Sequence, residues 1–195
     1  MWTLYLEHDH DCSSPNEWGG WHVRSFDRND CDYASHDLAE NDLEQMLANK
    51  AAFMLDRLEH SGVVWSLHDE GMQCRWDTSR NAGYIYCEAD DIPEDKRLES
   101  ARLFLDEYNK WIAGRCYYFS LMTDDGEDVS DSCSGFIGEE YIVECLRGEH
   151  PELFYGNAIK DTVEVKGDAA WILEDMEIAD TTMEEDPLGL DELDL

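Results

Sequence analysis

Four residues that can ligate a metal stand together near the start of the chain. They are His8, His10, Asp11 and Cys12, in the sequence HDHDC. A tetrahedral site needs ligand pairs spaced to wrap one ion, and it needs a second pair elsewhere. The sequence offers no second cluster of this kind. We therefore expect a solvated loop here, without metal or cofactor, and metal binding by the segment is the alternative.

A second polar segment precedes a predicted strand. It consists of Asp77, Thr78, Ser79 and Arg80. A phosphate-binding loop needs several glycines and a lysine at the start of a helix, so a turn stabilised by Asp and Ser side chains is the better interpretation. The seven cysteines and seven histidines permit too many nucleophile and base pairs for any one to be informative. We expect a protein without enzymatic activity, and a metal- or cysteine-dependent enzyme is the less favoured alternative.

The number of carboxylates is the most unusual property of the chain. It has 47 acidic and 14 basic residues, a net charge of −33. No lysine or arginine follows Lys166, and residues 167–195 hold 11 acidic residues. The preceding 166 residues still carry 36 acidic against 14 basic residues. The imbalance therefore belongs to the whole chain, and it indicates something about partners rather than about the fold.

Four segments concentrate these carboxylates: 88–95, 123–131, 139–140 and 184–194. The residues expected to contact a partner are Asp90, Asp91, Glu94, Asp95, Asp124, Asp125, Glu127, Asp128, Asp131, Glu139, Glu140, Glu184, Glu185, Asp186, Leu190 and Leu193. Each run by itself is typical of a solvated loop or a helix cap, so the functional hypothesis depends on their sum. Four leucines, three in the last run and Leu195 directly after it, are interleaved with acids, and an adaptor that docks through this tail is therefore an alternative function.

Apolar spacing predicts the elements that must position these residues. A first helix over 38–60, capped by Ser35 or Asp37, is expected because apolar residues recur at helical spacing before Gly62: Leu43, Met46, Leu47, Met54 and Leu58. A second helix follows Pro93 and ends at Gly114, with an apolar stripe of Leu98, Ala101, Leu105, Tyr108 and Ile112. A short helix is expected over 139–148 and an amphipathic segment over 169–178.

Alternating and β-branched segments predict the strands, which cover 1–8, 19–26, 63–68, 82–88, 116–123, 128–133 and 162–166. The first two are expected to pair as a hairpin, and so are 116–123 and 128–133 across the turn DDGE. A glycine-permitted bend with Phe136 buried should precede the short helix, capped by Glu139 and Glu140.

Apolar residues are 43% and aromatic residues 11% of the chain, which favours a folded protein. The order of elements predicts one α+β domain over 1–170, with an antiparallel sheet, two longer helices and one short helix. An acidic-hydrophobic tail, partly disordered, is expected over 171–195.

The cysteines are odd in number and form no CxxC pair, and the first residues lack the pattern of a secretion signal. No apolar run approaches the roughly 20 residues of a membrane span. We therefore expect a cytoplasmic protein that does not bind a membrane.

The stretch EYNKWIAGRCYYFSLMTDDGEDVSDSCSGFIGEEY, with HSG at 60–62 and WD followed by GYIY at 76–86, resembles a pattern in uncharacterised bacteriophage and mobile-element proteins. Its most characteristic part is D-S-C-x-G-F-x-G, and the resemblance covers residues 60–145. Relatives often carry Trp after this cysteine, where this chain has Ser134. The resemblance implies a phage setting, and therefore the cytoplasm of a host bacterium, but no activity and no catalytic residues.

Duplex DNA presents about one negative charge per 1.7 Å of its axis to the basic surfaces of its partners. A folded protein with dense carboxylates can occupy such a surface, as anti-restriction and anti-CRISPR proteins do by analogy. The sequence thus favours an inhibitor that binds a basic nucleic-acid-binding host protein and does not itself bind nucleic acid.

Overall fold

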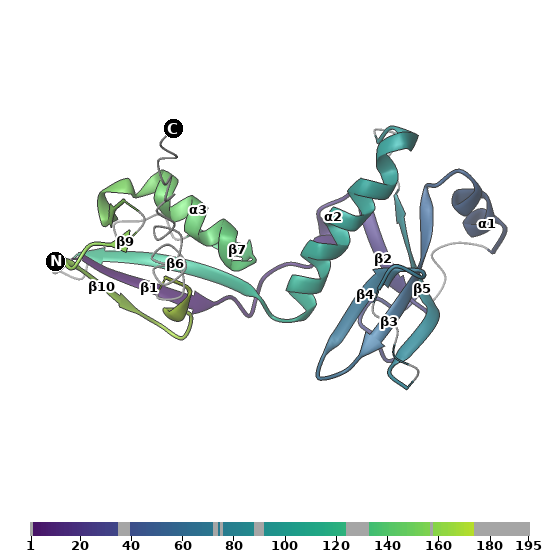
Figure 1. The fold of residues 1–195 in the computed structure, drawn as a ribbon, viewed down its shortest axis with the longest axis horizontal. Coiled ribbons are helices and arrows are strands. Elements are labelled where there is room, and N and C mark those ends of the chain that lie inside the picture. Colours follow the sequence, from purple (N-terminus) through teal and green to yellow (C-terminus); the bar gives the residue numbers. More distant parts are fainter. Residues whose placement is uncertain are drawn as a thin grey trace, which may run out of the picture. The chain divides into compact units, whose positions relative to one another are not determined.

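The computed structural model describes residues 2–34, 40–71, 74, 76–87, 92–123, 133–156 and 158–173. Two compact units are present (Figure 1). Unit 1 consists of residues 1–10 and 116–195, and unit 2 of residues 11–115, so unit 2 is an insertion in the chain of unit 1. Helices and mainly antiparallel sheets occur in both units, which confirms the predicted α+β class. The expected boundary between a domain of 1–170 and a tail of 171–195 stays a prediction.

Unit 2 is built on a four-stranded antiparallel sheet with the order β2-β5-β3-β4. Its elements in chain order are η1 (Pro15–Glu17), β2 (Trp21–Ser25), α1 (Glu40–Ala48), β3 (Ala52–Glu59), β4 (Val63–Leu67), β5 (Thr78–Cys87) and α2 (Glu94–Ile112).

The two helices of unit 2 pack on opposite faces of this sheet, because side chains alternate along each strand. On one face, Val23, Leu55 and Ile85 contact the buried residues of α2, which are Ala101, Leu105 and Tyr108. On the other face, Ala52, Tyr84 and Tyr86 contact α1 through Leu43, Met46 and Leu47. The predicted second helix is confirmed, and it ends before Gly114, whose φ of 74° only glycine adopts readily.

The predicted helix over 38–60 is wrong in its second half. Helix α1 ends at Ala48, Lys50 has a positive φ, and Ala52–Glu59 forms β3. As a central strand, β3 is covered on both faces, so its apolar residues do not alternate clearly and can be mistaken for a helical stripe. Leu55, which lies outside that expected stripe, is fully buried.

The edge strands of this sheet are each closed by an asparagine side chain. On β2, Asn16 accepts from the Val23 N–H (2.8 Å) and donates to its C=O (3.2 Å). On β4, Asn109 of α2 accepts from the Trp65 N–H and donates to its C=O, both at 2.8 Å. Each amide takes the place that a neighbouring strand's peptide group would occupy, so these positions are closed to a further strand.

The sheet of unit 1 has the order β10-β1-β6-β7. Strand β1 pairs antiparallel with β6 and parallel with β10. The elements are β1 (Trp2–His8), β6 (Cys116–Thr123), β7 (Cys133–Ile137), α3 (Glu139–Glu149), η2 (Pro151–Leu153), β8 (Phe154–Tyr155), β9 (Ala158–Ile159) and β10 (Val163–Lys166).

Helix α3 packs on this sheet through Ile142, Val143 and Leu146, which join the core formed by β1 and β6. Figure 1 shows α3 lying along one face of the sheet. Ala169, Ile172 and Leu173, from the expected amphipathic segment, are buried in the same core, and the segment after residue 173 lies outside the described residues.

Two strand pairings differ from the sequence prediction. The strand at 19–26 exists as β2, but it pairs with β5 in unit 2 rather than with β1. Strand β6 does have an antiparallel partner, but this is β7, over 133–137, where a bend was expected. Phe136 is only half-buried there, and Gly138 occupies the cap position of α3 without a side-chain bond. The expected turn and return strand over 124–132 lie outside the described residues.

Strands 63–68, 82–88, 116–123 and 162–166 and the helix over 139–148 are confirmed as β4, β5, β6, β10 and α3. Strand β5 begins earlier than expected, at Thr78, and a register shift against β3 accommodates residues of the predicted turn. The first helix is shorter than expected, so α2 is the longer helix among the described residues.

Replacing Gly167 by alanine should strongly destabilise unit 1. Gly167 has a φ of 103°, and an added Cβ would lie 2.0 Å from the backbone oxygen of Leu6. Gly156 is the matched control, because it also has a positive φ (62°) but no atom within 4 Å of an added Cβ. We expect Gly167→Ala to lower the thermal unfolding midpoint well beyond Gly156→Ala, which should cost only about 1 kcal/mol. Equal shifts would show that the close approach to Leu6 is unimportant.

Candidate functional site

The negative charge is distributed unequally between the two units. Unit 1 contains 25 acidic and three basic residues in 90 positions, a net charge of −22 with neutral histidines. Unit 2 contains 22 acidic and 11 basic residues, a net charge of −11 over 105 positions. The carboxylates of unit 1 therefore have far fewer cations to neutralise them.

In unit 2, basic side chains pair with nearby carboxylates. Arg102 donates two hydrogen bonds to Glu70, at 2.9 and 2.6 Å, and this pairing holds the pKa of Glu70 below its usual value. Further ion pairs are Lys50–Glu94 (3.2 Å), Arg57–Asp30 (3.3 Å), Arg80–Asp69 (3.2 Å) and Lys110–Asp106 (3.0 Å). Much of the acidic surface of this unit is thus balanced locally.

The three basic residues of unit 1 contact an aromatic ring, a backbone oxygen and a carboxylate, respectively. The guanidinium of Arg147 lies over the ring of Phe154, 5.7 Å from its centroid. Lys160 donates to the backbone oxygen of Glu152 at 2.6 Å, and Lys166 pairs with Glu164 at 2.8 Å. Unit 1 thus has three lysine and arginine residues for its 25 acidic residues, and Lys166 of these pairs with Glu164.

The expected contact residues Glu139 and Glu140 open α3. Glu139 is half-buried and accepts a hydrogen bond from the Tyr117 hydroxyl at 2.6 Å. Glu140, Glu144 and Glu149 are exposed, and the opposite side of the helix enters the core. The structure thus places Glu140 and Glu144 about one turn apart on the outer side of α3 and Glu149 at its C-terminal end. The sequence prediction named only the first turn.

The other described pair, Glu94 and Asp95, lies in the first turn of α2 in unit 2, where the helix dipole stabilises acidic side chains. Both are exposed, and Glu94 pairs with Lys50. The remaining predicted contacts lie outside the described residues: Asp90, Asp91, Asp124, Asp125, Glu127, Asp128, Asp131, Glu184, Glu185, Asp186, Leu190 and Leu193.

Two exposed tyrosines among the described residues of unit 1 were missed by sequence reasoning. Tyr155, at the end of β8, is 83% exposed, and Tyr141, on α3, is 46% exposed. Tyrosine is enriched among the residues that dominate binding energies at protein interfaces. A lone tyrosine in a sequence gives no sign of exposure, although Tyr141 directly follows the Glu139–Glu140 pair.

The HDHDC segment is divided between the two units. His8 pairs with Asp168 (3.2 Å), and its ring stacks with His10. The backbone N–H of His8 also donates to Asp168 and is the main cause that lowers the pKa of this carboxylate. Cys12 belongs to unit 2, where its backbone oxygen accepts from the indole of Trp111. The contacts of His8 and His10 thus lie within unit 1, and the contact of Cys12 lies within unit 2.

The described residues contain one group whose ligand atoms lie within 4.8 Å of one another: Asp56, His68 and Asp69. Asp56 is 1% exposed, and it accepts from His68 Nδ1 (2.8 Å), from the Asp69 N–H (3.1 Å) and from the Asn81 N–H (2.9 Å). Asn81 lies where β5 shifts register against β3. The carboxylate of Asp56 thus accepts the Asn81 N–H at the point where the ladder of β3 and β5 is interrupted. This role is structural.

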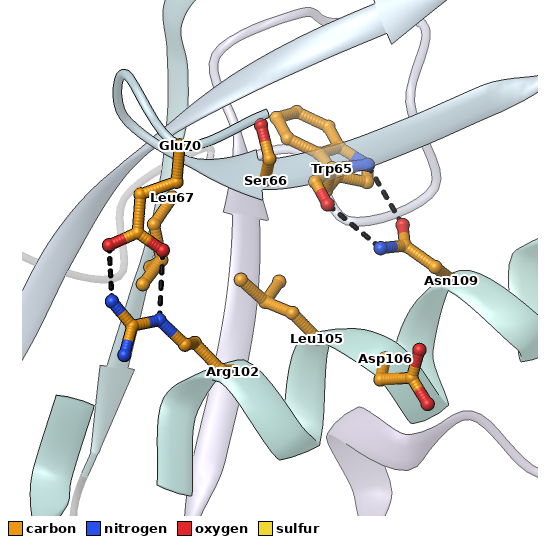
Figure 2. A pocket seen from close by; sticks show the side chains of 8 residues that line it. All are labelled: Trp65, Ser66, Leu67, Glu70, Arg102, Leu105, Asp106 and Asn109. Carbon is orange, nitrogen blue, oxygen red and sulfur yellow. Dashed lines mark hydrogen bonds and ion pairs between the residues drawn. The ribbon is translucent and has the colours of Figure 1, made fainter. Parts of the chain in front are cut away.

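An open pocket of about 240 Å³ lies between β4 and α2 in unit 2. Figure 2 shows Arg102 facing Glu70 in a fork and Asn109 facing the backbone of Trp65, with Leu105 between them. Its polar groups already serve the ion pair and the closed sheet edge. A ligand would have to compete with these contacts, so this pocket is a weaker candidate than the acidic surface.

Two cysteines have thiols that are harder to ionise than a free cysteine. Burial, followed by the carboxylate of Glu149, raises the pKa of Cys145 to about 11. Burial and Asp32 raise the pKa of Cys31. Catalytic cysteines require a lowered pKa, so neither environment is that of a nucleophile.

Asp56→Asn should destabilise unit 2 by about 3 kcal/mol, because an amide cannot accept from all three donors in this buried position. Asp69→Asn is the matched control, since Asp69 also contacts His68 but is 60% exposed, and it should cost less than about 1 kcal/mol. Urea unfolding followed by tryptophan fluorescence checks this, because five of the seven tryptophans lie in unit 2. Similar losses for both variants would contradict the structural role of Asp56.

The raised pKa of Cys145 predicts slow alkylation by iodoacetamide at pH 8. Because the neutral thiol persists up to a pKa of about 11, the rate should rise about tenfold per pH unit between pH 8 and 10. In urea the pKa returns to about 8.5, so the rate should level off near pH 9. Mass spectrometry of the labelled peptide measures both profiles, and identical profiles would refute the effect of the fold.

Among the described residues, no helix is both long and apolar enough to cross a membrane.

The candidate site is the acidic surface of unit 1, because this unit has 25 acidic and only three basic residues. Among the described residues, this surface is centred on the outer side of α3. Comparisons of the chain with protein-family models, with curated proteins and with solved structures found no match.

Proposed function

We propose that the protein is a non-enzymatic, phage-type inhibitor that binds the basic nucleic-acid-binding surface of a host defence complex of the CRISPR or restriction class. The carboxylates of unit 1 take the place of nucleic-acid phosphates on that surface. The observation that carries this proposal is the charge of unit 1, which has 25 acidic residues and only three basic ones.

Electrostatics supports this use of unit 1 rather than unit 2. A surface in which each acid faces a base presents little net field to a partner, whereas an unbalanced acidic surface attracts a basic one over a Debye length of about 8 Å at physiological salt. Unit 2 is closer to the first description, because several of its basic side chains pair with carboxylates and its net charge is −11 rather than −22. Unit 1, with 25 acidic and three basic residues, is closer to the second, and Glu140, Glu144 and Glu149 are exposed on its helix α3.

The exposed tyrosines support a protein partner. Charge alone speeds association and orients the partner, but the binding energy at interfaces comes largely from a few buried aromatic and arginine side chains. Tyr141 is partly exposed on the same helix as the exposed glutamates. An arginine of a nucleic-acid-binding surface can contact both a carboxylate and a tyrosine ring.

Two variants with equal charge changes test which unit binds. The first neutralises three exposed acids of α3: Glu140→Gln, Glu144→Gln and Glu149→Gln. The second neutralises three exposed acids of α2: Glu94→Gln, Asp95→Asn and Glu99→Gln. We expect the α3 variant to bind an inhibited effector about tenfold more weakly at 100 mM salt, and the α2 variant less than about threefold.

The measurement uses purified CRISPR and restriction nucleases in a DNA-cleavage assay, followed by affinity titration of those that are inhibited. Affinity should fall steeply between 100 and 500 mM salt, and DNA should compete. Binding that is insensitive to salt would contradict mimicry.

Truncation after Pro187 removes three acids, as the two variants do, together with four leucines. The acids are Asp191, Glu192 and Asp194. Loss of most activity on truncation, with full activity of the α3 variant, would favour the adaptor function instead.

A further inference from the structure

Strand β10 forms one edge of the sheet in unit 1, and its outward backbone groups follow from the register. Trp2 lies opposite Val163, and the Trp2 N–H donates to the oxygen of Thr162 (3.3 Å). In a parallel ladder, alternate residues face the neighbouring strand. Glu164 and Lys166 therefore bond to β1, and the N–H and C=O of Val165 point away from the sheet.

This edge differs from both edges of the sheet in unit 2. There, Asn16 and Asn109 each bond the N–H and the C=O of an edge residue. Within the described part of the chain, no side chain closes Val165 in this way. β10 also contains no proline and shows no register shift against β1.

We propose that β10 accepts an extended segment of the partner protein as an added strand, and that this segment alternates apolar and basic residues. Val163 is buried and Val165 half-buried against the core, whereas Glu164 and Lys166 are exposed on the opposite face. In an antiparallel pair, a residue opposite Val165 has its side chain on the same face. Apolar residues of the added strand would therefore extend the core. Its basic residues would lie on the face of the Glu164–Lys166 ion pair, so their attraction comes from the net charge of unit 1 rather than from Glu164 alone.

Charge decides between this occupant and a second copy of the chain. Two copies joined at β10 would bring together two units of net charge −22. A basic segment instead gains from that field, and a short edge strand supplies the hydrogen bonds that fix its register. This inference rests on the proposed function, because it takes the partner to be basic.

The test uses the full-length protein and the peptide Ac-KVKVK-NH2, with affinity measured by titration and protection measured by hydrogen exchange. We expect exchange of the Val165 N–H to slow at least about tenfold at saturating peptide. Val165→Pro removes this outward donor without removing a bond to β1, so the fold should be kept and the peptide should bind at least about tenfold more weakly.

Two control peptides separate strand addition from attraction by charge alone. The peptide N-methylated at both valines has the same charge but lacks the N–H groups that would face β10, and it should bind at least about tenfold more weakly to the wild-type protein. Ac-EVEVE-NH2 should not bind. Equal binding of the methylated peptide, or equal binding to a folded Val165→Pro variant, would overturn strand addition.

The methylated peptide gives this answer on the wild-type protein even where the proline variant does not fold. The outcome is also separate from that of the proposed function. Nuclease inhibition that survives Val165→Pro and falls in the α3 variant would overturn the strand-addition inference alone. Peptide binding at β10 without nuclease inhibition would overturn the proposed function alone.

Discussion

The described sheets depend on side-chain oxygens that take the place of missing backbone partners. Where β5 shifts its register, the N–H of Asn81 bonds to Asp56. Where β6 and β7 shift in unit 1, the N–H of Gly135 bonds to Asp9 at 2.9 Å. A buried N–H without a partner costs about 1–3 kcal/mol, so the buried Asp56 permits an irregularity that the ladder alone would not tolerate. The bond between Gly135 and Asp9 is exposed, so it contributes less.

This use of carboxylates divides the acidic residues into two kinds. Asp9, Asp56 and Asp168 accept backbone N–H groups and are fixed parts of the fold. Glu140, Glu144 and Glu149 instead lie exposed on a helix whose other side is buried. In the proposed function, acids of the second kind contact the partner. The net charge of the chain therefore overstates the acidic surface available for binding, and it is the position of each acid that matters.

The sequence predicted elements whose pattern is local. Helix α2 has a capping proline position, an apolar stripe and a terminal glycine, and each can be recognised within a window of about 20 residues. Strand β3 was mistaken for helix because its side chains are buried on both faces of the sheet, by α2 on one and α1 on the other, which no local pattern contains. The pairings of β1 were missed for the same reason, since its partners β6 and β10 lie more than 100 residues away.

The candidate site was predictable to a similar degree. Glu139 and Glu140 were found as an acidic pair before an apolar segment, but Glu144 was missed because it joins Glu140 on one surface only on a folded helix. Glu149, at the end of the same helix, was missed as well. The structural role of Asp9 could not be recognised either, because in the sequence it lies within the HDHDC cluster of metal-ligand residue types. Residues of the same type thus have different roles, because the backbone groups that they contact lie far away in the chain.

The two units also differ in what they leave open to other proteins. Unit 2 balances many of its charges and closes both sheet edges with asparagines, as expected of a unit that must avoid further contacts. Unit 1 keeps an excess of carboxylates and an edge strand whose Val165 N–H points outward. Charge attracts any basic surface, whereas strand pairing requires one register and one direction. A binding unit that combines both can associate quickly with many basic proteins but remain bound only to one that supplies a suitable strand.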